Sequence, residues 1–298
     1  MRDGLVVVDK EPGWTSHDVV AKLRGIYGQR RVGHAGTLDP DATGVLLVGL
    51  GRVTRLLRFL QEAGKEYRAR VVFGVATDTL DASGAVLERT EMHVTRARLE
   101  EVARSFTGDI EQVPPMVSAL KVEGRRLYEL AREGVEVERA ARPVHIAELV
   151  VEEFEPGPYP EAAMRVACSS GTYVRTLAAD LGAALGGCAH LSELRRLRVG
   201  SFTLAEARTI DALATDPDVH VLAPAVAVRD LPRVTVDGET ARAVAHGATF
   251  PASTFGPDVD NAQEFALVDA TGELLAVYER RGGGVKPAVV LATAAVPS

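Results

Sequence analysis

Residues 33–44 read GHAGTLDPDATG and place one carboxylate, Asp39, in a short loop punctuated by glycines. Pro40 fixes its own φ and directs the preceding Asp39 toward an extended backbone. The glycines allow sharp turns or the close approach of another backbone. The loop runs into the apolar stretch 45–50, which predicts a buried strand. Such rigidity suits a carboxylate held beside a substrate, although an Asp-Pro pair by itself also begins ordinary turns.

Length and composition predict a globular protein without a membrane span. The chain has 298 residues and is 46% hydrophobic, enough for a large domain or for a large and a small one. Its first ten residues hold only four consecutive apolar residues, too few for a signal peptide. The longest apolar runs are far below the roughly 20 residues of a membrane helix. Two cysteines, Cys168 and Cys188, fit a reducing compartment and lack zinc-ligand spacing. We therefore expect a cytoplasmic protein with no metal site.

The charge of the chain is unevenly distributed. The net charge of −7 argues against a protein that coats nucleic acid indiscriminately. Residues 22–70, however, contain ten Lys and Arg against four Asp and Glu, a local charge of +6 around the Asp39 loop. Further basic clusters comprise Arg195, Arg196 and Arg198, and then Arg280, Arg281 and Lys286. Scattered charge is usually solvated surface, whereas this clustering predicts a polyanionic partner on one face.

Hydrophobic periodicity predicts an α+β fold with a mixed or antiparallel central sheet and flanking helices. Strands are expected at residues 5–9, 45–50 and 65–73, and residues 146–154 and 162–169 suit an antiparallel pair. Helices are expected from Ser16, as N-cap, to a stop at Gly28, and at residues 53–60, 95–106 and 173–185.

Two later regions depart from this pattern. Residues 114–143 open with two prolines and are rich in both charges, which indicates a protruding insertion with a short helix around 125–133. Beyond residue 216 the pattern weakens, with a short helix within 235–249 and strands at 265–268, 274–278 and 288–291. We therefore divide the chain into a domain of residues 1–228 and a small β-rich domain of residues 229–298.

Four further segments complete a constellation: KEPGWTS (10–16), KEY (65–67), SSGTYVR (169–175) and AHLSELRRL (189–197). With the Asp39 loop, and over essentially the whole chain, they resemble the bacterial TruB family of tRNA pseudouridine synthases, which modify the T-loop at position 55. The resemblance implies the pseudouridine synthase fold followed by a PUA-like RNA-binding domain at 229–298, and an RNA-contacting insertion at 114–143. It also implies tRNA as partner. The chain has neither a GxxxxGK(S/T) phosphate loop nor a GxGxxG after a strand, so we expect no cofactor, and no obligate protein partner is evident.

The resemblance assigns catalytic roles to three residues. Asp39 matches the essential aspartate, which would attack the sugar or the base or remove a sugar proton, and the residues leave these routes open. Tyr67 matches a tyrosine that stacks on the uracil and helps to move the C5 proton. Arg175 matches an arginine that pairs with the aspartate and holds it ionised.

The resemblance also assigns six residues to substrate binding. His34 matches a histidine that fills the stack after the base flips, and Asp81 matches a second acid of the arginine network. Leu194, in a segment with a helical pattern, matches an apolar pocket residue. The others are Lys10, which packs under the site, Lys65, which shares a strand face with Tyr67, and Tyr173, a supporting wall.

Three positions depart from the family pattern. Glu11 separates Lys10 from Pro12, where the family usually has proline directly after the lysine. Val117 stands where an aromatic residue is common, and Glu66 where a basic residue is frequent. These departures bear on local RNA contacts.

Two alternative functions use the same features. A non-catalytic RNA-binding or RNA-folding protein would use the basic face, the insertion and the C-terminal domain equally well, but has no evident need for Asp39 facing a polyanion. A carboxylate glycosidase normally needs two acids at a fixed separation, for which only Asp39 and Asp81 are suggestive.

Overall fold

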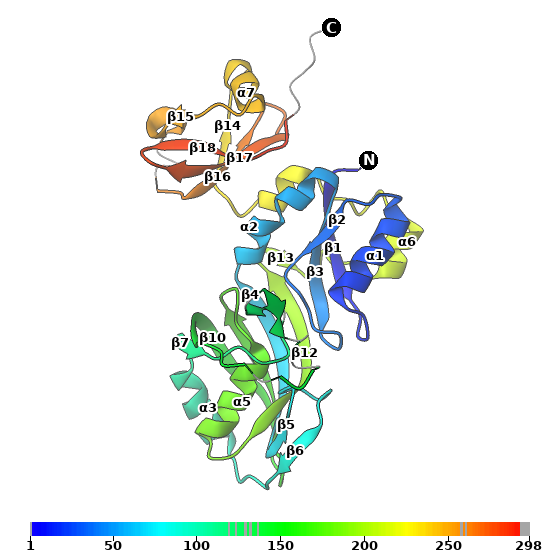
Figure 1. Cartoon of the computed structure of the whole chain (residues 1–298), viewed down its shortest axis with the longest axis vertical. Coiled ribbons are helices and arrows are strands. Elements are labelled where there is room, and N and C mark those ends of the chain that lie inside the picture. Colours follow the sequence, from blue (N-terminus) through cyan, green and yellow to red (C-terminus); the bar gives the residue numbers. More distant parts are fainter. Residues whose placement is uncertain are drawn as a thin grey trace. The chain divides into compact units, whose positions relative to one another are not determined.

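The alternating segment Lys65–Phe73 forms strand β4, the centre of an antiparallel sheet (Figure 1). Its neighbours are β12 (Ala189–Val199) and β11 (Glu161–Cys168), both antiparallel to it. The sheet continues from β11 to β10 (Arg142–Glu155) and then to β7 (Gly108–Gln112). The predicted antiparallel pair at 146–154 and 162–169 is confirmed as β10 and β11. The helical pattern inferred around Leu194 is wrong, because this residue pairs with Ala69 inside strand β12.

Two helices cover this sheet. Helix α3 (Arg96–Ser105) begins at the N-cap Thr95 and packs on β10, and α5 (Val174–Ala184) packs on β4 and β12. The two helices also contact each other, and each buries one apolar face, as the periodicity predicts. Strands β5 (Val75–Thr77) and β6 (Val86–Arg89), which the sequence reasoning missed, form a separate hairpin.

This computed structural model describes residues 2–118, 120–122, 124–127, 130, 133–135, 137–256, 259 and 261–292. Within them the chain forms two compact units. The first comprises Met1–Pro40, Val45–Gln61 and Gly200–Ser298, and the second comprises Asp41–Gly44 and Glu62–Val199. The sheet just described belongs to the second unit. No helix in the described part of the chain is long and apolar enough to span a membrane.

The first unit begins with strand β1 (Gly4–Lys10), which lies beside β3 (Thr43–Leu50). Strand β2 (Val32–Ala35) is antiparallel to β3 and leads into the Asp39 loop. Predicted helix 53–60 is a 3-10 helix, η1 (Gly51–Arg55), followed by α2 (Leu57–Glu62). Later in the chain come β13 (Phe202–Thr203), α6 (Ile210–Thr215) and the 3-10 helix η2 (Pro224–Val228).

Helix α1 (Ser16–Tyr27) ends where the sequence predicts but begins differently. Gly28 terminates it with a left-handed φ of 59°, a conformation that glycine adopts without steric cost. The N-cap is Thr15, not Ser16, because Thr15 and Asp18 exchange the hydrogen bonds of a capping box. Ser16 instead exchanges hydrogen bonds with the backbone of Leu38.

The C-terminal part of the first unit is β-rich, as predicted. It contains a five-stranded sheet in the order β14 (Arg233–Thr235), β16 (Glu264–Val268), β17 (Leu274–Arg281), β18 (Gly284–Val290) and β15 (Phe250–Pro251). Helix α7 (Gly238–Ala245) and η3 (Ala252–Phe255) accompany it. Phe255, Phe265 and Tyr278 pack in its core. The domain boundary at residue 229 remains a prediction.

The predicted insertion is described only in part. Strands β8 (Lys121–Val122) and β9 (Arg125–Arg126) form a short antiparallel pair. Most of the predicted helix at 125–133 lies outside the described residues. Arg142 and Pro143, the last two residues of the predicted insertion, pair with β7 as part of β10, and the bounds 114–143 stay a prediction.

Candidate active site

Hydrogen bonds hold the backbone of the Asp39 loop at Leu38 and at Pro40, the two neighbours of Asp39. The hydroxyl of Ser16 accepts from the Leu38 N–H at 2.9 Å, and the N–H of Gly13 donates to the Pro40 carbonyl at 3.0 Å. Lys10 Nζ donates to the same carbonyl at 2.7 Å. Asp39 is itself half-buried. The first unit therefore brings together the KEPGWTS segment and residues 33–40 of the Asp39 loop.

Lys10 is the central contact of this arrangement. It is fully buried, and its ammonium also donates to the carbonyls of Glu11 and Trp14 at 2.9 and 2.7 Å. An ammonium has three N–H donors, and these three carbonyls can accept all of them. Burial of a charged group is costly unless it is satisfied in this way. Glu11 takes part through its backbone, so its departure from the family pattern leaves the contact intact.

His34 lies on β2, opposite Val48 of β3, and is half-buried. Its ring packs edge-on against the exposed His17, with 5.4 Å between the ring centroids. The strand places His34 five residues before Asp39. Sequence reasoning did not single out His17.

The buried Arg175 and the half-buried Asp81 form an ion pair in the second unit. The guanidinium donates to the Asp81 carboxylate at 3.2 Å, to the Thr79 carbonyl at 3.2 Å and to the Val117 carbonyl at 2.8 Å. Arg175 is only 5% exposed. Its fork thus holds two loops together through one carboxylate and two carbonyls. Since Val117 contributes its carbonyl, this contact does not depend on an aromatic side chain there.

The loop that carries Asp81 is ordered by its own side chains and by β12. One carboxylate oxygen of Asp81 accepts hydrogen bonds from the Thr79 hydroxyl and from Ser83. Leu80 has a φ of 63°, which is rare for a residue other than glycine. A hydrogen bond from the N–H of Leu191 in β12 to the Leu80 carbonyl, at 3.0 Å, holds Leu80 in this strained conformation. No pattern in the sequence indicated this strained residue.

A buried glutamine positions the start of α5, and sequence reasoning missed it. Gln112, 2% exposed, accepts from the Tyr173 N–H at 3.0 Å and donates to the Tyr173 carbonyl at 3.3 Å. Tyr173, the N-cap residue of α5, has no capping side chain of its own. The glutamine therefore holds the backbone of the N-cap residue on both sides, which positions the start of the helix and Arg175 two residues later.

Tyr67 and Lys65 share the buried face of β4. Tyr67 lies opposite Val166 of β11 and Arg196 of β12, and Leu194 lies two residues before Arg196 on β12. Lys65 Nζ donates to the Ala63 carbonyl at 2.8 Å. Burial, reinforced by the positive charge of Arg196, lowers the pKa of Lys65 from 10.5 to about 8.

The prediction that Arg195, Arg196 and Arg198 form a basic surface cluster is wrong for Arg196. Its side chain is 1% exposed, so it is part of the interior. Arg198 pairs with Glu66 at 3.0 Å, so Glu66, which departs from the family pattern, has a partner.

Gly44, with a φ of 99°, lies opposite Arg196, and a Cβ there would overlap the Arg196 carbonyl oxygen. Only glycine allows this close pairing of β3 with β12.

The predicted site residues thus fall into two structural groups. Lys10, His34 and Asp39 belong to the first unit. The second unit contains the remaining six: Lys65, Tyr67, Asp81, Tyr173, Arg175 and Leu194. Within the described residues, no cluster of three or more His, Cys, Asp or Glu side chains could hold a metal ion.

Comparison with known proteins identifies the family. The model of the TruB family pseudouridylate synthase N-terminal domain matches residues 24–174, and that of the tRNA pseudouridylate synthase B C-terminal domain matches residues 175–220. The chain belongs to the TruB family of pseudouridylate synthases. Both groups of site residues fall partly or wholly within the matched region.

Individual relatives of this TruB-family chain are similar along most of their length. A tRNA pseudouridine synthase B of Symbiobacterium thermophilum is 53% identical over 82% of each chain. One of Thermobifida fusca is 48% identical over 98% of this chain and 99% of the relative. Among solved structures, a Cbf5-Nop10-Gar1 complex contains a chain with a TM-score of 0.76 and 28% identity, covering 98% of this chain and 85% of that chain. These neighbours agree with the mixed α+β fold.

Proposed function

We propose that this TruB-family chain isomerises a uridine of tRNA, in the T-loop at position 55, to pseudouridine in the cytoplasm. Membership of the family and the tRNA pseudouridine synthase names of its relatives support this function. The observation that carries it is the Asp39 loop, whose flanking backbone is fixed by Lys10, Gly13 and Ser16. Such fixation prepares a carboxylate for a substrate, which a simple RNA-binding surface would not need.

The reaction is an isomerisation and consumes no second substrate. The C1′–N1 bond breaks, the uracil rotates, and a C1′–C5 bond forms, while C5 loses a proton and N1 regains one. The side chains of the site must therefore promote two proton transfers and the replacement of the C1′–N1 bond by a C1′–C5 bond. Asp39 supplies the carboxylate that acts on the sugar or the base, by covalent attack or by proton removal.

The other site residues have supporting roles in this proposal. A base in a folded RNA must leave its stack to react, and His34 fills the gap that it leaves. Tyr67 stacks on the uracil and assists the loss of the C5 proton, with Leu194 as an apolar neighbour. Arg175 completes the electrostatic environment, positioned by Asp81, whose carboxylate it contacts at 3.2 Å. Lys65 and Tyr173 line the site, and Lys10 supports the Asp39 loop.

The RNA would be held by three regions: the basic segment 22–70, the insertion and the C-terminal β-rich part. We assign residues 229–298 as a PUA-like RNA-binding domain. Its sheet has a core of its own around Phe265 and Tyr278, which supports a separate role for this part.

Release of tritium from C5-labelled uridine in unmodified tRNA tests the reaction. We expect release with the wild-type protein and a loss of at least 1,000-fold, on the order of removing an essential catalytic group, with Asp39→Asn. tRNA affinity should stay within about twofold, because the substitution keeps the side-chain shape. Tight tRNA binding with no release from the wild type would instead favour the non-catalytic RNA-binding protein.

Removal of the C-terminal domain tests the proposed division of labour. A chain truncated at about Leu231 should bind tRNA more weakly while kcat at saturating tRNA changes less. The truncation also removes the Val290 and Leu291 carbonyls, which accept from Arg55 and Arg52. Thermal unfolding should therefore accompany the binding titration, and equal tRNA affinity of the two folded proteins would contradict the assignment.

A further inference from the structure

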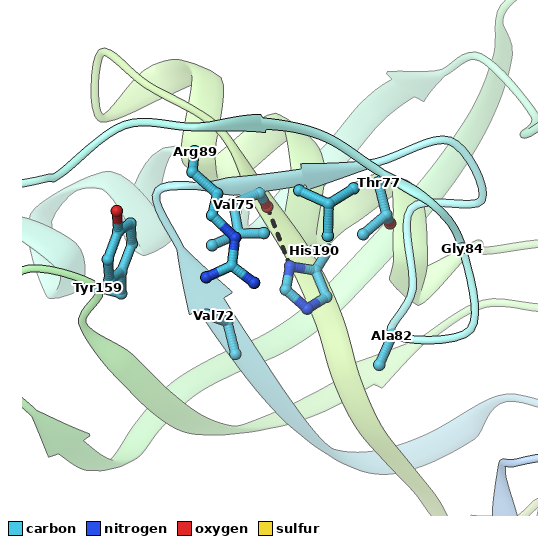
Figure 2. A pocket seen from close by; sticks show the side chains of 9 residues that line it. Val72, Val75, Thr77, Ala82, Gly84, Arg89, Tyr159 and His190 are labelled. Atoms are coloured by element: carbon cyan, nitrogen blue, oxygen red, sulfur yellow. Dashed lines mark hydrogen bonds between the residues drawn. The ribbon is translucent and has the colours of Figure 1, made fainter.

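The second unit contains a pocket of about 340 Å³ that no role proposed above uses. It lies between the β5–β6 hairpin, the end of β4 and the start of β12 (Figure 2). The volume is at the lower end of the range for small-ligand sites, about 300–1,000 Å³. Apolar side chains from β4 and the hairpin form part of its wall, and His190, Arg89 and Tyr159 supply its polar groups.

His190 presents an acceptor to the pocket. It is 8% exposed, and its Nδ1 lies 3.0 Å from the Val75 carbonyl oxygen. A carbonyl only accepts, so Nδ1 carries the proton in that contact and Nε2 of the neutral ring is an acceptor. Figure 2 shows the other side of the ring turned into the pocket, away from Val75. Among the described residues Nε2 has no hydrogen-bond partner, and it is not one of the buried polar atoms that lack one, so it is open to a ligand.

Arg89 supplies an unpaired cation at the same pocket. It lies opposite Val75 in the β5–β6 pairing, and its guanidinium points into the pocket beside His190 (Figure 2). Within the described part of the chain, Arg89 makes no ion pair or side-chain hydrogen bond, and none of the lining residues is acidic. The lining side chains therefore include one cation and no carboxylate, although the chain as a whole is acidic.

Tyr159 forms a rigid wall of the pocket. The backbone is tied on both sides of it, because the Pro158 carbonyl accepts from Met92 and the Pro160 carbonyl accepts from Phe73, each at 2.9 Å. The ring lies so close to Gly74 that a Cβ there would be 3.0 Å from it. A fixed aromatic wall, a cation and an imidazole acceptor match the three parts of a nucleotide: ring, phosphate and base N–H.

We propose that this pocket binds one nucleotide of the RNA, distinct from the uridine that reacts. Arg89 contacts the phosphate, His190 Nε2 accepts from a base N–H, and Tyr159 packs against the ring. The RNA origin of the nucleotide rests on the proposed tRNA function. In this arrangement the pocket adds affinity and orientation, and the chemistry remains with the Asp39 site.

Substitution of Arg89 tests the proposal in the full-length protein with unmodified tRNA. Arg89→Met should raise the KM for tRNA, and the dissociation constant, by about tenfold, as expected for a lost charged contact to phosphate. The salt dependence of binding should fall by about one counterion. Arg89→Lys should restore most of the affinity. The matched control is Arg98→Met on α3, an exposed arginine paired with Glu101, which should leave KM unchanged.

A titration with uridine 5′-monophosphate and with inorganic phosphate separates the possible sources of the ligand. We expect weak mononucleotide binding that Arg89→Met abolishes, together with the tRNA effect. Tight mononucleotide binding with an unchanged KM for tRNA would overturn the RNA origin. Unchanged tRNA and mononucleotide binding in the folded Arg89→Met protein would overturn the pocket itself. A wild type that binds tRNA but releases no tritium would refute the proposed reaction and leave the pocket test valid.

Discussion

Two buried cations organise the two groups of site residues in different ways. Lys10, in the first unit, donates to three backbone carbonyls around the Asp39 loop. Arg175, in the second unit, donates to two carbonyls and to the Asp81 carboxylate. Both cations join segments that are distant in sequence, since Pro40 lies 30 residues after Lys10 and Asp81 lies 94 residues before Arg175. They differ in their acceptors: the compact ammonium contacts carbonyls only, whereas the planar guanidinium also pairs with a carboxylate.

The largest loss of stability is expected when the Arg175 guanidinium is removed. Arg175→Met leaves the Asp81 carboxylate and two carbonyls without this donor, so the free energy of unfolding should fall by about 3–5 kcal/mol. Arg175→Lys should recover only part of it, because one ammonium cannot reproduce the fork. Urea unfolding measures both, and tritium release should fall by more than 100-fold in each folded variant. Full recovery by lysine would show that charge alone matters there.

A smaller effect is expected at Lys10. Lys10→Met leaves three carbonyls without their donor but also removes the cost of a buried charge, for a net loss of about 2–3 kcal/mol. The loosened Asp39 loop should lower kcat about tenfold and leave the KM for tRNA less affected. Steady-state tritium release separates the two constants. A rise in KM at constant kcat would mean that Lys10 supports RNA binding and not the carboxylate.

Lys65 provides the smallest and most specific test, through pH. Its pKa is lowered to about 8 in the folded protein, against 10.5 for an ordinary lysine. Between these values the unfolded chain binds the proton that the folded chain has released, so the free energy of unfolding rises with pH. The stability of the wild type relative to Lys65→Met should therefore increase from pH 8 to pH 10.5. Thermal unfolding of both proteins at pH 7.5 and 9.5 measures it, and a constant difference would contradict the lowered pKa.

Local sequence patterns determined much of the fold and the identity of the family. Alternation defined β4 and placed Lys65 and Tyr67 on one face, because side chains on a strand alternate with a period of two. Gly28 marked the end of α1, and Pro40 with its neighbouring glycines marked the Asp39 loop. These features depend on the backbone preferences of a few adjacent residues, which the chain carries before it folds.

The tertiary structure alone decided which groups are buried and what they contact. Arg196 looked like one of three surface cations and is interior, and Gly44 is needed because β3 approaches β12 there. Gln112 holds the backbone of Tyr173, the N-cap residue 61 residues later, and Arg175 pairs with Asp81 at a separation of 94 residues. Such pairings depend on distances set by the folded sheet, and no local period encodes them. The sequence by itself determined the local elements and the motif residues, and the folded chain determined their partners.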